Sequence, residues 1–193
     1  LDELGLYIIK EACKDAQKLQ KEGTPLSISV NISPKQLESA VFVREVRRIL
    51  QEVDLHDIQL ILEVTERSLL STSGRILERI RELKQLGIQM SMDDFGMGHS
   101  SMMYLQENAF DEVKLDGSLV RQILENERSR DIVRGITRLA ASMQFHVVAE
   151  FVETREQMEL LKALHCDIYQ GYYYGKPCSC DEFIIKYLKQ EPR

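Results

Sequence analysis

The sequence predicts an α/β fold, and within that class a (β/α)8 TIM-like barrel of which six βα units are present. Six short apolar runs with strand periodicity alternate with stretches of helical periodicity, and the connections are short, which is typical of a parallel sheet. The strands also have one apolar and one polar face, whereas an open sheet covered by helices on both sides needs two apolar faces. A complete barrel has eight strands and about 250 residues. Because this chain has 193 residues, we expect the first two strands to be absent from it.

The expected strands are apolar runs in which every second residue is polar, as where Ser27, Ser29 and Asn31 alternate with Ile28 and Val30. They cover residues 26–32, 59–64, 88–92, 111–116, 145–150 and 166–170. The stretches between them place apolar residues three and four positions apart, which predicts helices. We expect these helices at residues 4–19, 33–53, 74–86, 102–106, 117–143 and 154–164, with a last helix after Asp181.

Helix ends are marked by residues with special backbone preferences. Gly23 and Gly87 follow helical patterns, and glycine readily adopts the left-handed conformation that closes a helix. Ser33 followed by Pro34 favours a helix start, because serine accepts a hydrogen bond from the first turn and proline has a suitable φ. Within the long helical stretch of residues 117–143, the pattern allows a break near Asn126.

Composition limits the classes of function. With 44% hydrophobic residues, residues 1–193 can form one globular domain with a substantial core. The net charge of −6, without a basic run, argues against a polymeric nucleic acid or an anionic membrane as partner. No signal peptide and no apolar run of membrane-spanning length are found. The four cysteines lack zinc-site spacing, so we expect reduced thiols and a cytoplasmic domain. Because the chain begins without Met, we also expect it to be part of a longer and sometimes membrane-anchored protein.

The two strand faces differ in polarity, because successive side chains of a strand point to opposite sides. The apolar face, expected under the helices, comprises Ile28, Val30, Leu60, Leu62, Ile88, Met90, Met92, Val113, Leu115, Val147 and Ala149. The polar face comprises Ser27, Ser29, Asn31, Glu63, Gln89, Ser91, Asp93, Glu112, Lys114, Asp116, His146, Glu150 and Gln170. Its polarity is greatest where the strands end, and that is the edge at which (β/α) barrels keep their active sites.

The segment after the third expected strand is the clearest candidate site. There the strand leads into Asp93 and Asp94, and the glycines that follow allow a tight turn into a helix. The polar residues expected at the same edge are Asn31, Glu63, Asp93, Asp94, Lys114, Asp116, Glu150, Glu153 and Gln170.

This edge would carry six carboxylates and one lysine. At an effective dielectric constant near 20, two like charges about 4 Å apart repel by roughly 4 kcal/mol, so cations are needed. Oxygen ligands without thiols or clustered imidazoles favour Mg²⁺ or Mn²⁺. Two such ions would suit attack of water on a phosphodiester, with Lys114 offsetting the charge that develops on phosphate.

Simpler interpretations stay open for single residues. Asn31 is also typical of a helix cap or a turn. Lys114 could form only an ion pair, and Glu153 could be a carboxylate of the first helical turn that interacts with the helix dipole. We expect His146 to be a hydrogen-bonded interior residue rather than a ligand. The tyrosines at 172–174 could stack on a base or pack at the barrel rim.

Several segments together resemble the EAL-domain family of bacterial cyclic di-GMP phosphodiesterases, in the right order and over essentially the whole chain. The matching segments are Val30-Asn31-Ile32-Ser33, Glu63-Val64-Thr65-Glu66, Asp93-Asp94-Phe95-Gly96, Lys114-Leu115-Asp116, Ala149-Glu150-Phe151-Val152-Glu153 and Gln170-Gly171-Tyr172. One of these segments alone would be a weak signal, whereas six in register are specific.

The resemblance implies a barrel that hydrolyses cyclic di-GMP to linear pGpG with two Mg²⁺ or Mn²⁺ ions. By position, the implied metal ligands are Asn31, Glu63, Asp93, Asp94, Glu150 and Asp116. Lys114, Glu150 and Asp116 are the implied catalytic residues. The implied supporting residues are Glu66 and Glu153, which would brace the loop after the aspartates, and Gln170, Tyr174 and Pro177, which would contact the substrate. The family also implies a homodimer and fusion to sensory or diguanylate-cyclase-type domains.

The sequence departs from the family pattern in several places. The Glu-Ala-Leu segment is absent, which agrees with the two missing strands. Met97 and His99 stand where the family usually has Thr and Tyr, which affects the expected link between the dimer and the metal site. Phe151 replaces a usual Gly and Gly117 a usual Arg, and we expect these two changes to alter fit more than chemistry.

Two other functions compete with hydrolysis. A catalytically inactive receptor or regulatory domain that binds cyclic di-GMP would not need to keep all the carboxylates and Lys114. A Schiff-base enzyme using Lys114 as nucleophile would need a desolvated, neutral lysine, whereas the neighbouring carboxylates favour the charged form. If the enzyme interpretation holds, we expect residues 1–193 alone to be nearly inactive and prone to associate through exposed strand edges.

Overall fold

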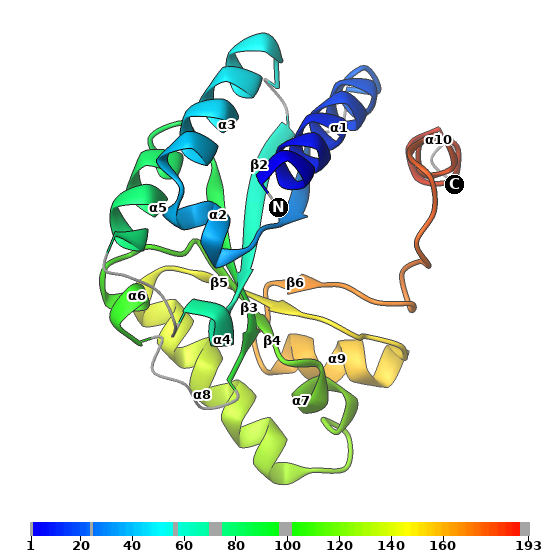
Figure 1. Cartoon of the computed structure of the whole chain (residues 1–193). Coiled ribbons are helices and arrows are strands. Elements are labelled where there is room, and N and C mark those ends of the chain that lie inside the picture. Colours follow the sequence, from blue (N-terminus) through cyan, green and yellow to red (C-terminus); the bar gives the residue numbers. More distant parts are fainter. Residues whose placement is uncertain (1, 24, 56–57, 70–74, 97–101, 190–193) are drawn as a thin grey trace. The chain divides into compact units, whose positions relative to one another are not determined.

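The computed structural model describes residues 2–23, 25–55, 58–69, 75–96 and 102–189. Its six strands are parallel and follow one another in the sheet in the order β1-β2-β3-β4-β5-β6 (Figure 1). A doubly wound sheet would reverse its strand order at a switch point, whereas barrel units add strands in sequence. The predicted α/β class with six βα units of the barrel type is therefore confirmed. The strands are β1 (Leu26–Asn31), β2 (Ile58–Thr65), β3 (Gln89–Phe95), β4 (Glu112–Leu115), β5 (His146–Ala149) and β6 (Ile168–Tyr169).

Helices connect and follow these strands. They are α1 (Asp2–Gln20), α2 (Pro34–Glu38), α3 (Ala40–Glu52), α4 (Glu66–Leu69), α5 (Ile76–Lys84), α6 (Met102–Gln106), α7 (Gly117–Arg121), α8 (Glu127–Met143), α9 (Arg155–Ala163), α10 (Cys180–Phe183) and the π-helix η1 (Ile184–Leu188). None of the helices in the described ranges is both long enough and apolar enough to cross a membrane. The chain forms two compact units, one of residues 1–63, 73–89 and 177–193 and the other of residues 64–72 and 90–176.

In the first unit, β1 and β2 pair in register from Leu26 opposite Ile58 to Asn31 opposite Glu63. Helix α1 packs against β1 and lies beside α3 (Figure 1). An apolar cluster at this interface is completed by the C-terminal segment, which contributes Ile184. The first unit thus joins chain segments that are far apart in the sequence.

In the second unit, β4 and β5 pair in register, and α8 packs against β5. The predicted apolar face is confirmed, because six of its side chains here are completely buried: Met90, Met92, Val113, Leu115, Val147 and Ala149. On the other face, Ser91, Glu112 and Lys114 are also buried, at 0%, 6% and 5% exposure. Burial of both faces fits strands whose polar side lines an interior.

One expected helix is divided in two. The helix predicted over residues 33–53 breaks at Ser39, whose extended backbone ends α2 and whose side-chain oxygen accepts a hydrogen bond from Phe42 N (3.2 Å) at the start of α3. Apolar periodicity does not detect such a break, because residues on both sides keep facing the core. The break expected near Asn126 is confirmed, since Asn126 caps α8.

Two further expectations are corrected. His146 is not an interior residue, because its side chain is 68% exposed and its Nδ1 lies 3.9 Å from Asp167 Oδ2. It is the first residue of β5, and a strand start lies at the rim, where water reaches a side chain whichever face it is on. Strand β3 does not stop before the aspartates but continues through Asp93 and Asp94 to Phe95.

Candidate active site

The two aspartates sit on an irregular part of β3. Along β3, three residue steps lead from Met92 to Phe95, whereas their partners on β4, Val113 and Leu115, are two steps apart. The strand therefore has one extra residue, and such bulges change the direction of side chains. Asp94 also has a φ of +55°, which is uncommon for a residue other than glycine. In a regular strand, the side chains of adjacent residues point to opposite faces of the sheet. The bulge and the positive φ interrupt this alternation at Asp93 and Asp94.

Lys114 on β4 is the buried cation of this site. Its Nζ lies 2.8 Å from Glu150 Oε1, just after β5, and 3.8 Å from Asp93 Oδ1 on β3. Three successive strands thus bring a lysine and two carboxylates together. These opposite charges favour the protonated amine, which argues against Schiff-base chemistry, because that chemistry needs the neutral amine.

Negative charge accumulates beside this group. The pKa of Asp94 is raised above its ordinary value by burial first and then by the charges of Asp93 and Asp116, against the opposing effect of Lys114. Three carboxylates are therefore close enough to repel one another. A cation placed among them would remove that repulsion.

Asp116 has a structural partner that the sequence did not indicate. Its Oδ1 accepts hydrogen bonds from Ser118 N (2.8 Å) and Ser118 Oγ (2.5 Å), which caps the start of α7. One carboxylate oxygen is thus engaged in capping. A metal-binding or catalytic role of Asp116 would have to use Oδ2.

The two residues expected to brace the loop after the aspartates differ in their surroundings. Glu66 is 3% exposed, and its Oε2 accepts a hydrogen bond from Gly96 N (3.3 Å), the last described residue before that loop. Glu153 is exposed, and its backbone N–H donates to Gln157 Oε1 (2.8 Å). Met97 and His99 of that loop lie outside the described residues, and the bracing role of Glu153 stays a prediction.

Asn31 and Glu63 belong to the first unit, where Asn31, the last residue of β1, is paired with Glu63 of β2. Glu63 is 4% exposed, and its carbonyl oxygen accepts a hydrogen bond from Ile32 N (2.8 Å). Asn31 is exposed and does not cap the following helix, because that position is taken by Ser33. The helix-cap interpretation of Asn31 is therefore wrong.

The expected substrate-binding residues lie near the sheet edge and are exposed. Gln170 follows β6, and its backbone N–H donates to Ala149 O (2.8 Å) while its carbonyl oxygen accepts from Val152 N (3.1 Å). Tyr174 packs against Tyr169 and Tyr173. Pro177 is exposed on the segment that enters the first unit.

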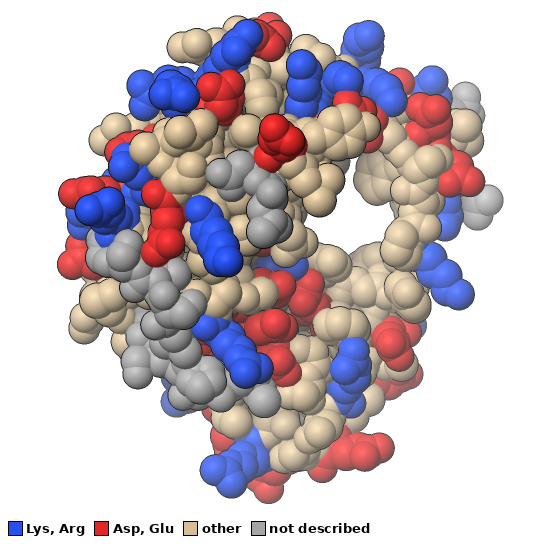
Figure 2. Space-filling model, in the orientation of Figure 1, with Lys and Arg blue, Asp and Glu red and all other residues tan. Residues whose placement is uncertain are grey.

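The donors of the second unit fit a hard divalent cation in kind, since they are carboxylate oxygens. Figure 2 shows acidic side chains gathered where β3 and β4 end. Within the described part of the chain, however, no three His, Cys, Asp or Glu side chains converge closely enough to hold one metal ion. The donor atoms are therefore of the type that binds a divalent cation. To bind one ion together, these side chains would have to move closer to one another.

Sequence reasoning missed one contact beside the site. The ring of Phe151, at a position where the sequence departs from the resembled pattern, lies against Gly117, the other such position. Arg121 stacks on this ring, with its guanidinium carbon 4.1 Å from the ring centre. The paired departures at positions 117 and 151 are the signal that could have indicated this contact.

Comparison with known proteins gives a consistent result. The family model of the EAL domain matches residues 1–177. A signaling protein of Caulobacter vibrioides is 40% identical over 96% of the chain, and cyclic di-GMP phosphodiesterase NbdA of Pseudomonas aeruginosa is 34% identical over 97%. The chain spans only 22% and 24% of the length of these two relatives.

Solved structures also resemble this chain. The EAL domain of Mycobacterium smegmatis DcpA has a TM-score of 0.86 at 29% identity, with 94% of this chain and 82% of that chain covered. The PaMucR phosphodiesterase in complex with c-di-GMP has a TM-score of 0.82 at 32% identity, with 94% and 74% covered. A manganese and cyclic di-GMP complex of Klebsiella pneumoniae BlrP1 has a TM-score of 0.81 at 25% identity, with 92% and 45% covered.

Proposed function

Because the chain belongs to the EAL domain family, we propose that it hydrolyses cyclic di-GMP to linear pGpG with two Mg²⁺ or Mn²⁺ ions. The observation that carries this proposal is the buried Lys114, held at 2.8 Å by Glu150 and at 3.8 Å by Asp93. A buried ammonium next to excess carboxylates suits a site that must both bind cations and stabilise a phosphate oxyanion.

The proposed roles divide between binding and charge stabilisation. We assign metal binding to six residues: Asn31, Glu63, Asp93, Asp94, Asp116 (through Oδ2) and Glu150. Bound there, the metals would supply a water that attacks phosphorus at neutral pH. Lys114 would donate hydrogen bonds to a non-bridging phosphate oxygen as its charge grows in the transition state. Glu150 and Asp93 would keep Lys114 protonated and oriented. Gln170, Tyr174 and Pro177 would contact the substrate.

The test is product formation by single-residue variants of the longer protein that the length of the relatives indicates, because residues 1–193 alone are expected to be nearly inactive. With Mn²⁺ or Mg²⁺, Asp93→Ala and Glu63→Ala are each expected to lower pGpG formation at least about a hundredfold, because loss of a ligand misplaces the activated water. Asp131→Ala removes an exposed carboxylate on α8 whose one ion pair among the described residues is with Arg134, and it serves as the matched control. Full activity in either site variant, or in excess chelator, would rule out the metal mechanism.

One observation favours a second candidate, a receptor that binds cyclic di-GMP without cleaving it. The described carboxylates do not converge on one point, as a binder without metals would allow. Calorimetry combined with chromatography separates the two functions. Binding that leaves the cyclic dinucleotide intact with Mg²⁺ and with Mn²⁺ would establish the receptor.

We also propose that the domain works as a homodimer alongside sensory or diguanylate-cyclase-type domains. The much greater length of the curated relatives supports the additional domains. Two half-exposed methionines on α6, Met102 and Met103, support a contact surface next to the loop after the aspartates. Light scattering at high protein concentration tests the dimer, and Met103→Lys is expected to weaken it.

A further inference from the structure

A cavity of about 340 Å³ lies in the second unit beside the candidate active site. Its walls include Arg121, Glu150, Phe151, Glu153, Gln170 and Tyr172. Glu150 connects it to the active site, since the same carboxylate holds Lys114. The cavity is at the small end of the range for ligand sites, so it suits one planar ring system rather than a whole dinucleotide.

Phe151 is held in an unfavourable backbone conformation at this cavity. Its φ is +55°, a region that bulky residues rarely adopt and that costs about 1–3 kcal/mol. The residue nevertheless stays 42% exposed, so its burial does not account for the conformation. Residues kept in such conformations concentrate at functional sites, where the surroundings fix a required geometry.

Two neighbours on α7 fix the ring of Phe151. A Cβ atom at Gly117 would lie only 2.5 Å from Cδ2 of the ring, so any side chain there would displace it. The guanidinium of Arg121 lies over the ring, 4.1 Å from its centre. Gly117, Arg121 and Phe151 therefore fit together as a set, and changing one of them moves the others.

The stack orients the guanidinium of Arg121. A cation over an aromatic face is attracted by the ring, so the guanidinium of Arg121 is held over Phe151 at the cavity wall. Arg121 forms no ion pair and no side-chain hydrogen bond with the described residues, so its N–H groups remain for a ligand. Its fork of donors matches two adjacent acceptors, as guanine offers with O6 and N7.

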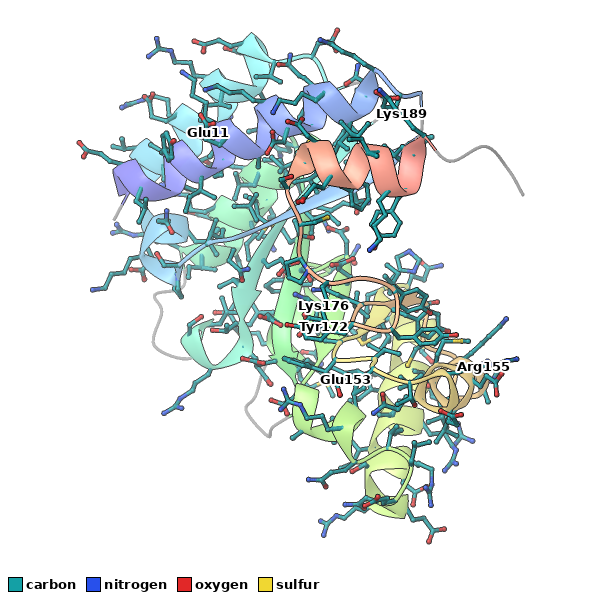
Figure 3. The ribbon with its side chains drawn as sticks, turned by 90° about the vertical axis from the view of Figure 1, so that its right-hand side faces the viewer. Glu11, Glu153, Arg155, Tyr172, Lys176 and Lys189 are labelled. Atoms are coloured by element: carbon teal, nitrogen blue, oxygen red, sulfur yellow. The ribbon has the colours of Figure 1, made fainter. Side chains whose placement is uncertain are left out.

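The rest of the wall suits the same base. Tyr172 offers an aromatic ring backed by Lys176, whose Nζ lies 5.6 Å from the ring centre, and Figure 3 shows these two side chains together. Glu153 can accept hydrogen bonds from N1–H and the amino group of guanine, and Gln170 can donate or accept. Adenine would instead place its amino group, a donor, where guanine has O6, so that only N7 would remain to accept a hydrogen bond from Arg121.

From these contacts we infer that Arg121, positioned by Phe151 and Gly117, is a specificity-determining residue that selects guanine over adenine in this cavity. The inference rests on the proposed function, because it concerns one base of the cyclic dinucleotide. The inference assigns selection of the base to Arg121 on α7 and to Phe151, the residue with positive φ that follows Glu150.

Equilibrium binding of hydrolysis-resistant phosphorothioate cyclic dinucleotides, one with guanine and one with adenine, tests the inference in the presence of Mn²⁺. The wild-type chain is expected to prefer the guanine compound, and Arg121→Ala should reduce that preference about tenfold or more. Arg138→Ala, which removes an exposed arginine of α8, should leave it unchanged.

The outcomes separate this inference from the proposed function. Wild-type protein that binds neither compound would overturn both. Guanine binding with an unchanged preference in Arg121→Ala would overturn only the inference. Equal weakening of both compounds would show that Arg121 contacts phosphate rather than a base, which also overturns it.

A double-variant cycle tests the positioning role of Phe151. Phe151→Gly is expected to fold, because glycine adopts a φ of +55° without strain, and to lose base preference as Arg121→Ala does. Gly117→Ala should reduce the preference by displacing the ring, but should add nothing in the Phe151→Gly background. Equal effects of Gly117→Ala in both backgrounds would show that its effect does not pass through the ring.

Discussion

Lys114 is almost completely buried and lies beside two carboxylates, Glu150 and Asp93. These surroundings determine the expected effect of removing its side chain. Lys114→Ala is expected to lower turnover at least about a hundredfold while metal affinity changes much less, because the ammonium acts on charge that develops in the transition state. Product chromatography gives the turnover, and calorimetry gives metal affinity.

Lys114→Met is the companion variant, since it keeps an unbranched chain of similar length without the charge. It should lose turnover as the alanine variant does. If metal affinity collapsed in both variants while turnover per metal-loaded molecule stayed normal, Lys114 would be a structural residue that only holds Glu150 and Asp93 in place.

Asp94 gives a prediction about pH. Because its pKa is raised in the folded chain, the folded state holds this proton more tightly than the unfolded state. The resulting contribution to the free energy of unfolding is complete below the unfolded pKa and is lost as pH rises through the raised value. In the presence of a chelator, the contribution of Asp94 to the free energy of unfolding should therefore fall as pH increases from below 4 toward neutral.

Asp94→Asn should remove that dependence. Near neutral pH the metal-free variant is expected to be more stable than wild type by about 0.5–1 kcal/mol, the range for partly exposed charge interactions, while it loses hydrolysis. Urea unfolding at several pH values measures this. A variant less stable than wild type at neutral pH in chelator would show that repulsion among the carboxylates is not significant.

At the scale of elements, Ser39 decides that α2 and α3 are two helices. Its side-chain oxygen satisfies Phe42 N, one of the amides that a helix start leaves without a backbone partner. Ser39→Ala is expected to lower the free energy of unfolding by about 1 kcal/mol. Ser142→Ala, which changes an exposed serine in the last turn of α8, should change it by less than about 0.5 kcal/mol. If Ser39→Ala and Ser142→Ala changed the free energy of unfolding in urea equally, Ser39 would not stabilise the chain as a helix cap.

The sequence alone predicted the buried strand face and the position of the candidate site, but not the division between α2 and α3. Strand periodicity predicted the buried face of Met90, Val113 and Val147, since alternation is a local property that tertiary contacts only reinforce. It also placed Lys114 beside Asp93 and Glu150, because carboxyl ends of parallel strands meet at one edge. The break at Ser39 leaves the apolar pattern intact, so the pattern could not reveal it.

Other features depend on contacts between distant residues. The bulge that includes Asp94 is defined only by the pairing of β3 with β4. Arg121 looks like an ordinary surface residue of a short helix until Phe151, thirty positions later, is found beneath it. Local sequence patterns do not predict such features, because each depends on a contact between residues that are far apart in the sequence.

At the scale of the whole molecule, the chain after β6 leaves the second unit and completes the core of the first. Residues beyond the family match at position 177 form α10 and η1, and Ile184 joins Ala16, Leu19 and Ile58 in one apolar cluster. Polar contacts accompany it, with Cys180 Sγ near Asp15 O (3.9 Å) and Lys189 Nζ near Glu22 Oε1 (3.6 Å). The stability of the first unit should therefore depend on this late segment.

Adjacent isoleucines of η1 allow a controlled test of that dependence. Ile184 is 8% exposed and Ile185 is 67% exposed, although both occupy the same helix and share the same helix propensity. Ile184→Ala is expected to lower the free energy of unfolding by about 2 kcal/mol, the lower end for buried isoleucine, because a terminal helix can partly refill the space. Ile185→Ala should change it by less than about 0.5 kcal/mol. If the two variants unfolded at the same urea concentration as wild type, the C-terminal segment would not be part of the folded core, and a chain ending at residue 177 would be equally stable.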